Sequence, residues 1–245
     1  MTDEDRAFAE KRKRFYEDFY HAGEPMDPWH AYAQGIVHST TRTWFRELVG
    51  DKGGLILNAG SGGIDYGIRA PMIHLDLAPT RISRFPGYIV GDISEIPAED
   101  SLFDVVLCVG SVLNYGNPVS GLREFQRVLR PGGILILEYE RSGSPEYWQE
   151  HGLSSACTLV DSFYGSIKTQ LWVYADRFID ELLKTHHFKT LKERRFHGLS
   201  SILLAITSSP KIASRFTFAD QHLSRIWPFR YVASNRMLAV KKLAD

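Results

Sequence analysis

A glycine-rich turn followed by two acidic residues is the part of this sequence that most clearly suggests chemistry. The stretch Leu55–Gly63, LILNAGSGG, reads as an apolar strand that runs into glycines, and Asp76 and Asp92 end two further apolar runs. Because glycine lacks a Cβ, such a turn bends sharply and lets a ligand approach the backbone. A carboxylate after the second strand can accept hydrogen bonds from both ribose hydroxyls. The pattern predicts a nucleoside-bearing cofactor at the carboxyl ends of parallel strands.

The spacing of the glycines argues against two common nucleotide sites. A dinucleotide-binding fingerprint that began at Gly60 would need a glycine where the chain has Asp65. The phosphate-binding pattern G-x-x-x-x-G-K-[ST] does not occur in the sequence. A cofactor that carries a ribose but no phosphate therefore fits these residues better.

At this point the chain resembles the class I S-adenosylmethionine-dependent methyltransferases. In that family a strand ending in L-D-x-G-x-G-x-G is followed by an acidic ribose ligand and then by an acid near the adenine. Four later blocks match the family in order, namely Ile73–Leu77, Tyr88–Ile93, Phe103–Ser111 and Leu122–Leu137. The resemblance covers about residues 53–140 and implies S-adenosyl-L-methionine as the cofactor.

The resemblance also implies which positions hold that cofactor. The turn would bind its amino-acid portion, Asp76 the ribose, and Asp92 with Ile93 the adenine. The predicted cofactor-binding residues are Asn58, Ala59, Gly60, Ser61, Gly62, Asp76, Leu77, Asp92, Ile93, Val109, Gly110 and Ser111.

Two residues depart from the family pattern. Asn58 stands where the family has an acid in the first strand, and Ile64 replaces the third glycine. The segments 63–71 and 79–86 also leave little room for helices. We therefore expect a compressed version of the fold on this side of the sheet.

Polar and aromatic residues near the later strand ends are candidates for acceptor binding and proton transfer. The predicted substrate-binding residues are Trp29, His30, Asn114 and Tyr115. The candidate bases for a protonated acceptor are His38, Tyr115 and Glu138, with Glu140 beside them. Core packing of amphipathic helices, a polar loop or a solvated strand end would explain the same residues without any catalytic role.

The elements that would position these residues form one α/β domain. We expect a Rossmann-like, doubly wound, seven-stranded and mostly parallel sheet with an antiparallel last strand. Residues 1–50 predict an N-terminal helical extension or lid, and 51–141 the cofactor-binding core. Residues 142–170 predict a substrate loop with a short helix, and 171–245 the C-terminal part, with a helical pair inserted at about 197–232.

Hydrophobic periodicity places several elements within these parts. The extension predicts helices over 3–21 and about 36–49, and the C-terminal part predicts a helix over 176–187 and strands over 188–196 and 235–242. The helix that begins near Leu122 is expected to stop at Pro131-Gly132-Gly133, before the fifth strand.

The composition of the chain indicates which classes of partner to expect. Its 29 basic residues balance its 29 acidic ones, so no global field draws it to nucleic acid or to an anionic membrane, although a local patch could do so. The two cysteines form no disulfide framework, and neither a signal peptide nor a membrane-spanning apolar run is evident. Metal-ligand spacing is missing as well. A cytoplasmic protein without a metal is predicted.

These expectations converge on methyl transfer to an oxygen, nitrogen or carbon atom of a small molecule by in-line displacement. The absence of a basic excess argues against a nucleic-acid substrate. Two alternatives stay open: methylation of RNA or protein, and a non-catalytic relative that binds the cofactor or a partner. The sequence does not predict the oligomeric state.

Overall fold

The computed structural model describes residues 27–50, 53–148, 156–164, 167–223, 226 and 229–244. The helix predicted over 3–21 lies outside these residues. Within them, no helix has the length and the apolar character needed to cross a bilayer.

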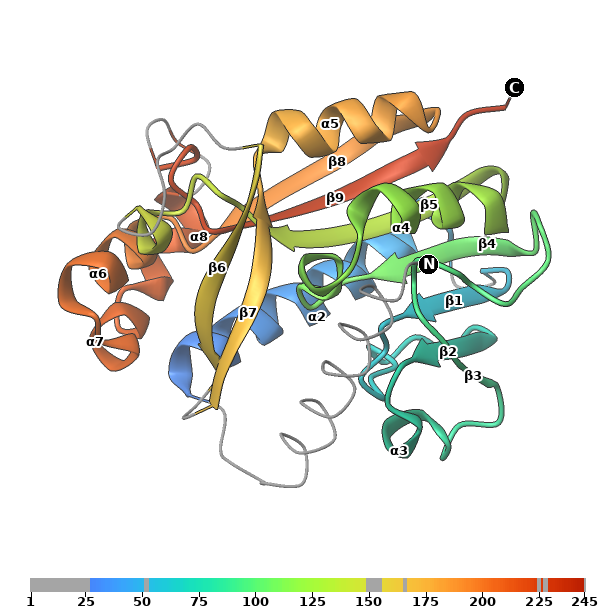
Figure 1. The fold of residues 1–245 in the computed structure, drawn as a ribbon, viewed down its shortest axis with the longest axis horizontal. Coiled ribbons are helices and arrows are strands. Elements are labelled where there is room, and N and C mark those ends of the chain that lie inside the picture. The colour runs from blue at the N-terminus through green and yellow to red at the C-terminus, as the bar shows by residue number, and fades with distance from the viewer. Residues whose placement is uncertain are drawn as a thin grey trace.

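Seven strands form the central sheet in the order β3-β2-β1-β4-β5-β9-β8 (Figure 1). They are β1 (Ile56–Ala59), β2 (Met72–Asp76), β3 (Tyr88–Val90), β4 (Phe103–Cys108), β5 (Leu129–Glu140), β8 (Phe188–Phe196) and β9 (Asn235–Lys242). The first five strands pair in parallel, and β9 pairs antiparallel with both β5 and β8. The predicted mostly parallel sheet with an antiparallel last strand is confirmed.

Alternate residues of the central strands face two separate cores, as a sheet covered on both sides requires. On one side, α4 (Pro118–Val128) and α5 (Asp176–Thr185) pack against Leu57 and Val106. On the other side, α2 (Pro28–Leu48) packs Trp44 and Phe45 near Ile56. The predicted second helix was therefore placed correctly at its end but not at its beginning.

The start of α2 is explained by its cap. Asp27 accepts hydrogen bonds from the backbone N–H groups of Trp29 and His30, and Pro28 occupies the first turn, where it loses no hydrogen bond. The sequence Asp-Pro signals this start, but the polar residues that follow it weaken the apolar period used to set the prediction.

Two details around β5 and β1 differ from or refine the expectations. Because α4 ends at Val128 and β5 begins at Leu129, Pro131-Gly132-Gly133 lies within the strand and not before it. The pairing of β4 with β5 is irregular there, and Gly132 has a φ of 80°, which fits a bulge.

The side of the sheet at β1 to β3 is compressed as expected. Between β1 and β2 the described chain contains no helix, and α3 (Pro79–Ile82) has only four residues.

The segment predicted as a substrate loop with a short helix contains that helix, Pro145–Tyr147, but its second part forms strands of a β-hairpin and not a loop; its role in substrate binding stays a prediction. Strands β6 (Cys157–Tyr164) and β7 (Ile167–Tyr174) pair antiparallel across two intervening residues. Val160, Leu171 and Val173 point to one side of the hairpin and pack with Tyr147 in a small apolar cluster. Alternating burial, which stabilises one register, gives the hairpin its inner face.

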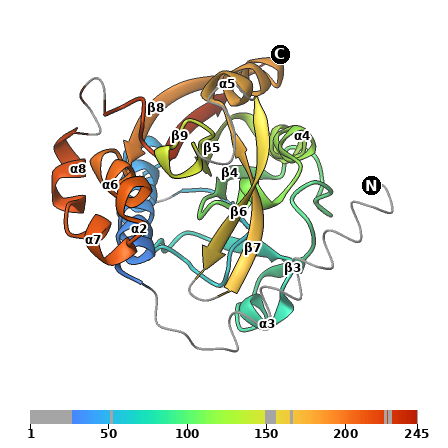
Figure 2. The ribbon, with the colours of Figure 1, turned by 60° about the vertical axis from the view of Figure 1, so that its left-hand side comes forward.

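The insertion after β8 contains three helices and not the predicted pair. These are α6 (Leu199–Thr207), α7 (Pro210–Ser214) and α8 (Thr217–Leu223), and Pro210 separates the first two by starting a new helix at its first position. They lie beside the N-terminal end of α2 (Figure 1). Figure 2 views the molecule from this end, with the hairpin between the three helices and α4.

Candidate active site

One cavity of about 730 Å³ collects residues that are far apart in the sequence. The carboxyl ends of β1, β4 and β5 contribute to it, together with α2, the segment before the hairpin, β6 and the insertion. It is lined by Trp29, His30, Ala33, Gln34, Val37, His38, Gly60, Ser61, Gly62, Ile64, Tyr66, Arg81, Val109, Gly110, Ser111, Tyr115, Glu138, Glu140, Pro145, Glu146, Tyr147, Asp161, Ser162, Phe196, Leu204, Ala205, Ser208, Pro210 and Asn235. Its volume lies in the range of ligand sites in proteins.

The cavity brings together many of the residues chosen from the sequence, but not all of them. Those that line it are Gly60, Ser61, Gly62, Val109, Gly110, Ser111, His38, Tyr115, Glu138, Trp29 and His30. Those that do not line it are Asn58, Ala59, Asp76, Leu77, Asp92, Ile93 and Asn114. Among the described residues, no group of three or more His, Cys, Asp or Glu side chains is arranged to hold a metal ion.

The glycine turn after β1 is held in a conformation that few other residues could adopt. Gly60, Gly62 and Gly63 have φ values of 72°, 53° and 77°. A Cβ on Gly60 would lie 2.3 Å from a methyl carbon of Val112, so the loops after β1 and β4 touch here. By contrast, a Cβ on Gly110 would meet nothing within 4 Å, because Gly110 borders the open space of the cavity.

Asp76, at the end of β2, lies directly beside the turn although it does not line the cavity. Its Oδ2 accepts a hydrogen bond from the Gly62 N–H at 2.7 Å, and its Oδ1 accepts one from Ala78 N–H at 2.9 Å. Burial raises the pKa of Asp76 above its usual value, although both hydrogen bonds oppose that rise. Asp76, the residue predicted to bind the ribose, is therefore hydrogen-bonded to the turn predicted to bind the cofactor.

Three other predicted residues have roles within the protein. Asn58, which replaces the acid of the family pattern, donates from Nδ2 to the Ile64 carbonyl at 2.6 Å and ties down the far side of the turn. Asn114 uses both ends of its amide, accepting from Glu140 N–H and donating to the Glu140 and Trp172 carbonyls, so it is not directed at a substrate. Asp92 accepts from Ser94 N–H in a local turn.

Glu138 connects the loop after β4 to the neighbouring strand β9. Its Oε2 accepts from the Gly110 and Ser111 N–H groups at 2.9 and 2.5 Å, and its Oε1 accepts from Asn235 Nδ2 at 2.7 Å. Burial, the largest effect, raises the pKa of Glu138 to about 7 in spite of these bonds. Ser111 has a φ of 58°, so Glu138 also stabilises a strained backbone turn in the cavity wall.

A second acidic group lies at the end of the cavity formed by β5 and the segment before the hairpin. Glu140 accepts a hydrogen bond from Tyr147 Oη at 2.6 Å. Burial and then the charge of Glu140 raise the pKa of Glu146 to about 7. Sequence reasoning missed Glu146 because the chain brings it to Glu140 only through the turn at Pro145.

Two histidines of α2 face the cavity in different protonation environments. Burial disfavours the charged form of His30, but the hydrogen bond and charge of Asp27, with the charges of Glu140 and Glu146, hold its pKa above the usual value. Burial and then the charge of Arg42 lower the pKa of His38. The Nε2 atom of His38 has no hydrogen-bond partner among the described residues.

Trp29 is fixed by the insertion. Its ring stacks on His197, with ring centroids 3.6 Å apart and an angle of 15° between the planes. His197 Nδ1 is 3.1 Å from Ser200 Oγ, and Ser200 in turn hydrogen-bonds Asp220. Burial keeps the pKa of His197 well below the usual value, so a neutral ring supports the tryptophan.

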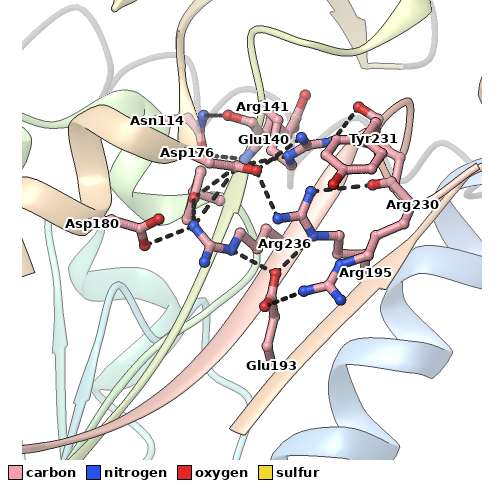
Figure 3. A network of polar contacts seen from close by, with 12 residues as sticks. Asn114, Glu140, Arg141, Asp176, Asp180, Glu193, Arg195, Arg230, Tyr231 and Arg236 are labelled. Carbon is pink, nitrogen blue, oxygen red and sulfur yellow. Dashed lines mark hydrogen bonds and ion pairs between the residues drawn. The ribbon is translucent and has the colours of Figure 1, made fainter. Parts of the chain in front are cut away.

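A network of arginines and acids holds the end of β5, where Glu140 lies (Figure 3). Arg141 binds Asp176 through two hydrogen bonds of 2.7 and 2.9 Å, and Arg195 and Arg236 approach the same carboxylate from β8 and β9. Burial opposes the ionisation of Asp176, but Arg141 and the two other arginines lower its pKa to about 2. The network thereby joins five charged residues from β8, β9, the start of α5 and the residue that follows β5, with Glu193 bridging Arg195 and Arg236.

Comparison with known proteins relates the chain to methyltransferases. Residues 60–137 match a family model described as a methyltransferase domain. The chain is 28% identical over 161 residues to a sterol 4-C-methyltransferase of Caenorhabditis elegans. The alignment covers 60% of this chain and 46% of that protein. The chain thus spans about half the length of the curated relatives it matches.

Solved structures share the fold over nearly the whole chain. A Burkholderia thailandensis 1,6-didemethyltoxoflavin-N1-methyltransferase, with 1,6-didemethyltoxoflavin and S-adenosylhomocysteine bound, aligns with a TM-score of 0.58 at 15% identity and covers 98% of this chain and 91% of its own. A putative sarcosine dimethylglycine methyltransferase of Galdieria sulphuraria aligns with a TM-score of 0.58 at 14% identity, covering 95% and 98%. At these identities the likeness is one of fold.

Proposed function

We propose that the chain is a class I S-adenosylmethionine-dependent methyltransferase that methylates a small molecule bound in the 730 Å³ cavity; the sheet order and the family match over residues 60–137 support this. The observation that supports this proposal most is the continuity of the cavity. It joins the glycine turn at Gly60–Gly62, where the cofactor would bind, to the acidic group around Glu140 and Glu146. Transfer between two bound molecules requires such a shared enclosure, because the reacting atoms must be held in line.

The residues at the turn fit S-adenosyl-L-methionine. The cavity has open space beside Gly110, and the Asp76 carboxylate at the end of β2 is within hydrogen-bond distance of the turn. In the proposed arrangement Gly60–Gly62 and Gly110 border the amino-acid portion, and Asp76 accepts from the ribose hydroxyls. When bound, the cofactor would supply an activated methyl group on its sulfonium.

The other end of the cavity would hold the acceptor. Trp29, Tyr115 and Tyr147 give it aromatic walls, while Glu140 and Glu146 give it hydrogen-bond acceptors. An acceptor that presents hydroxyl or amino hydrogens fits these groups best, because both carboxylates are half-buried and a carboxylate shielded from water is costly unless something pairs with it. The aromatic walls would also exclude water from the reacting atoms.

If the acceptor atom carries a proton, the acidic group offers the residues that could remove it. Glu146, with a pKa of about 7, is partly ionised at neutral pH and so can accept a proton. His38 is the second candidate, because its Nε2 has no hydrogen-bond partner in the described part of the chain and its lowered pKa keeps the ring neutral. Glu138 is the weakest of the three, since its two carboxylate oxygens already accept three hydrogen bonds.

The experiment that tests the proposal incubates the protein with S-adenosyl-L-methionine and fractionated small-molecule extracts, and follows methylated products by mass spectrometry. We expect at least one small molecule to gain a methyl group, with S-adenosylhomocysteine formed in equal amount. Glu146→Gln should slow this transfer without weakening cofactor binding. Cofactor binding with no product from any small-molecule fraction would contradict the proposed acceptor class.

A further inference from the structure

The insertion between β8 and β9 exposes an unusual amount of apolar surface. Six of the thirteen exposed large apolar side chains in the described part of the chain come from this one segment. They are Ile206 (74% exposed), Phe218 (71%), Tyr231 (62%), Ile226 (55%), Ile212 (43%) and Phe216 (39%), here named the insertion surface. Single exposed apolar residues are ordinary, so the feature to explain is that so many of them come from one insertion.

The same segment carries an excess of positive charge. Between residues 197 and 234 the sequence has four basic residues, Lys211, Arg215, Arg225 and Arg230, and one acid, Asp220. Asp220 is buried, where it accepts hydrogen bonds from the N–H groups of Leu199 and Ser200 and so caps α6. Lys211 and Arg215 are exposed, and no ion pair links either of them to a described residue, whereas Arg230 pairs with Glu193.

The segment is attached firmly enough to act as a preformed surface. Helix α6 packs against both α7 and α8, and Asp220 of α8 caps α6 directly. Ser201 Oγ donates to the Val232 carbonyl and so links α6 to the residues that lead into β9. In Figure 2 the three helices form the outer side of the molecule next to α2.

We propose that the insertion surface docks onto the headgroup region of a bilayer that contains anionic lipids. Phenylalanine and isoleucine beside lysine and arginine are the composition by which peripheral helices bind such an interface, through apolar burial and attraction to anionic lipid. A second copy would bring the same excess of basic residues to the contact, whereas an anionic lipid surface complements it. Since the whole chain has zero net charge, the attraction must come from this local patch.

Docking in this way has a consequence for the cavity. Leu204, Ala205 and Ser208 of the insertion form part of the cavity wall, while Ile206 in the same helix is among its most exposed residues. Helix α6 would therefore have one side on the cavity and another on the lipid. The proposal itself does not depend on methyl transfer, because it rests on surface composition alone.

The experiment measures co-sedimentation of the full chain with two kinds of vesicle, phosphatidylcholine alone and equimolar phosphatidylcholine with phosphatidylglycerol. We expect binding to the anionic vesicles that weakens as salt is raised, and little binding to the neutral ones. Two variants test the two components: Lys211→Glu/Arg215→Glu for charge and Ile206→Ser/Phe218→Ser for apolar burial. Each should reduce partition by at least about ten-fold.

Matched controls alter exposed residues elsewhere. Lys184→Glu/Lys189→Glu makes the same change of charge on α5 and β8, and Val119→Ser/Leu191→Ser makes a comparable apolar change on α4 and β8. Both should bind like the unaltered chain, and circular dichroism checks that all four variants fold. The proposal is overturned if the unaltered chain does not bind anionic vesicles or if the two test variants bind as well as the controls. A solution dimer that Ile206→Ser/Phe218→Ser dissociates would overturn it as well.

Discussion

At the residue scale, polar side chains in and near the cavity fall into two groups: those whose hydrogen bonds hold the protein together and those that face open space. The sequence predicted Glu138 as a base and Asn114 as a substrate-binding residue. In the structure Glu138 accepts hydrogen bonds from two backbone N–H groups and from Asn235, and the Asn114 side chain bonds to backbone groups. Glu140 and Glu146 have fewer internal donors around them. Their position beside Trp29 and His30 makes them the better candidates for contact with an acceptor.

Asp76 provides the clearest single-residue prediction. Asp76→Ala should weaken binding of S-adenosyl-L-methionine by about ten-fold to a hundred-fold, because a charged acceptor of ribose hydrogen bonds is worth roughly 1.5–3 kcal/mol. Isothermal titration calorimetry measures the change. Glu99→Ala, which removes an exposed acid, is the control and should bind normally. Equal affinity of the Asp76 variant and the unaltered chain would contradict the ribose assignment.

The raised pKa of Glu146 predicts a pH-dependent effect on stability. Its folded-state pKa of about 7 is above the usual value of 4.5, so the folded protein holds the proton more tightly than the unfolded chain does. The contribution of Glu146 is therefore most favourable below pH 4.5 and is lost as pH rises toward 7. Glu146→Gln should stabilise the protein relative to the unaltered chain, increasingly so between pH 4.5 and 7. Urea denaturation over this range would show whether the difference is instead constant.

At the element scale, the network around Asp176 holds together the end of β5, α5, β8 and β9 (Figure 3). Arg141→Met removes the arginine that makes two hydrogen bonds to Asp176 and leaves the carboxylate with Arg195 and Arg236. We expect a loss of about 3 kcal/mol in the free energy of unfolding, the lower end for breaking a buried pair. Arg130→Met is the control, because its pair with Asp104 is half exposed and contributes about 0–1 kcal/mol.

The same network predicts behaviour in acid. The folded-state pKa of Asp176, about 2, lies below its usual value of 3.8, so its stabilising contribution is complete above pH 3.8 and is lost as pH falls toward 2. In Arg141→Met this dependence should be smaller. Denaturation measured from pH 5 to pH 2 tests it, and an unchanged slope in the variant would show that Arg141 does not lower the pKa of Asp176.

The elements that the sequence predicted well are those whose signals are local. Apolar runs that end in polar residues placed the seven strands, and β8 and β9 begin and end where expected. The hairpin β6–β7 was missed because β6 shows no clear period of two: polar Thr158 lies on the same face as buried Val160, and apolar Leu159 lies on the opposite, exposed face. The third helix of the insertion was missed because helices of five and seven residues show too little periodicity.

The candidate site could be predicted only in part for a related reason. The turn at Gly60 and the acid at Asp76 follow their strands directly, so strand prediction also locates them. Glu146, Asp161 and Leu204 reach the cavity through contacts between distant segments. No pattern within a single segment reveals such a meeting, since it depends on how the hairpin and the insertion pack on α2.

At the scale of the whole molecule, the cavity is closed by parts of the chain that surround a conventional sheet. The N-terminal half of α2 faces the cavity, and its C-terminal half packs Trp44 and Phe45 onto the sheet. The lid predicted from residues 1–50 stays a prediction, and within the described residues it concerns the N-terminal half of α2. The stacking of Trp29 on His197 links α2 to the insertion. A ligand bound in the cavity would therefore contact several of these elements at the same time.

That arrangement predicts a large thermal shift on ligand binding. At one hundred times its dissociation constant, a ligand that binds only the folded state adds about 2.7 kcal/mol of stability. For a chain of this length, that corresponds to an increase of roughly 5–10 °C in melting temperature. Differential scanning fluorimetry with S-adenosylhomocysteine measures it, and Asp76→Ala should show a smaller shift at the same concentration. Equal shifts in the two proteins would place the ligand away from Asp76.

The central claim is that the turn after β1 and the cavity beside it form a site for S-adenosyl-L-methionine. The most direct measurement is calorimetric titration of the unaltered chain with S-adenosyl-L-methionine, followed by displacement with S-adenosylhomocysteine, with NAD and ATP titrated in parallel. The account predicts saturable binding of one cofactor per chain, competition by S-adenosylhomocysteine, and much weaker binding of the two phosphate-bearing nucleotides. Failure of both S-adenosyl compounds to bind the folded chain, or a preference for NAD or ATP, would contradict it.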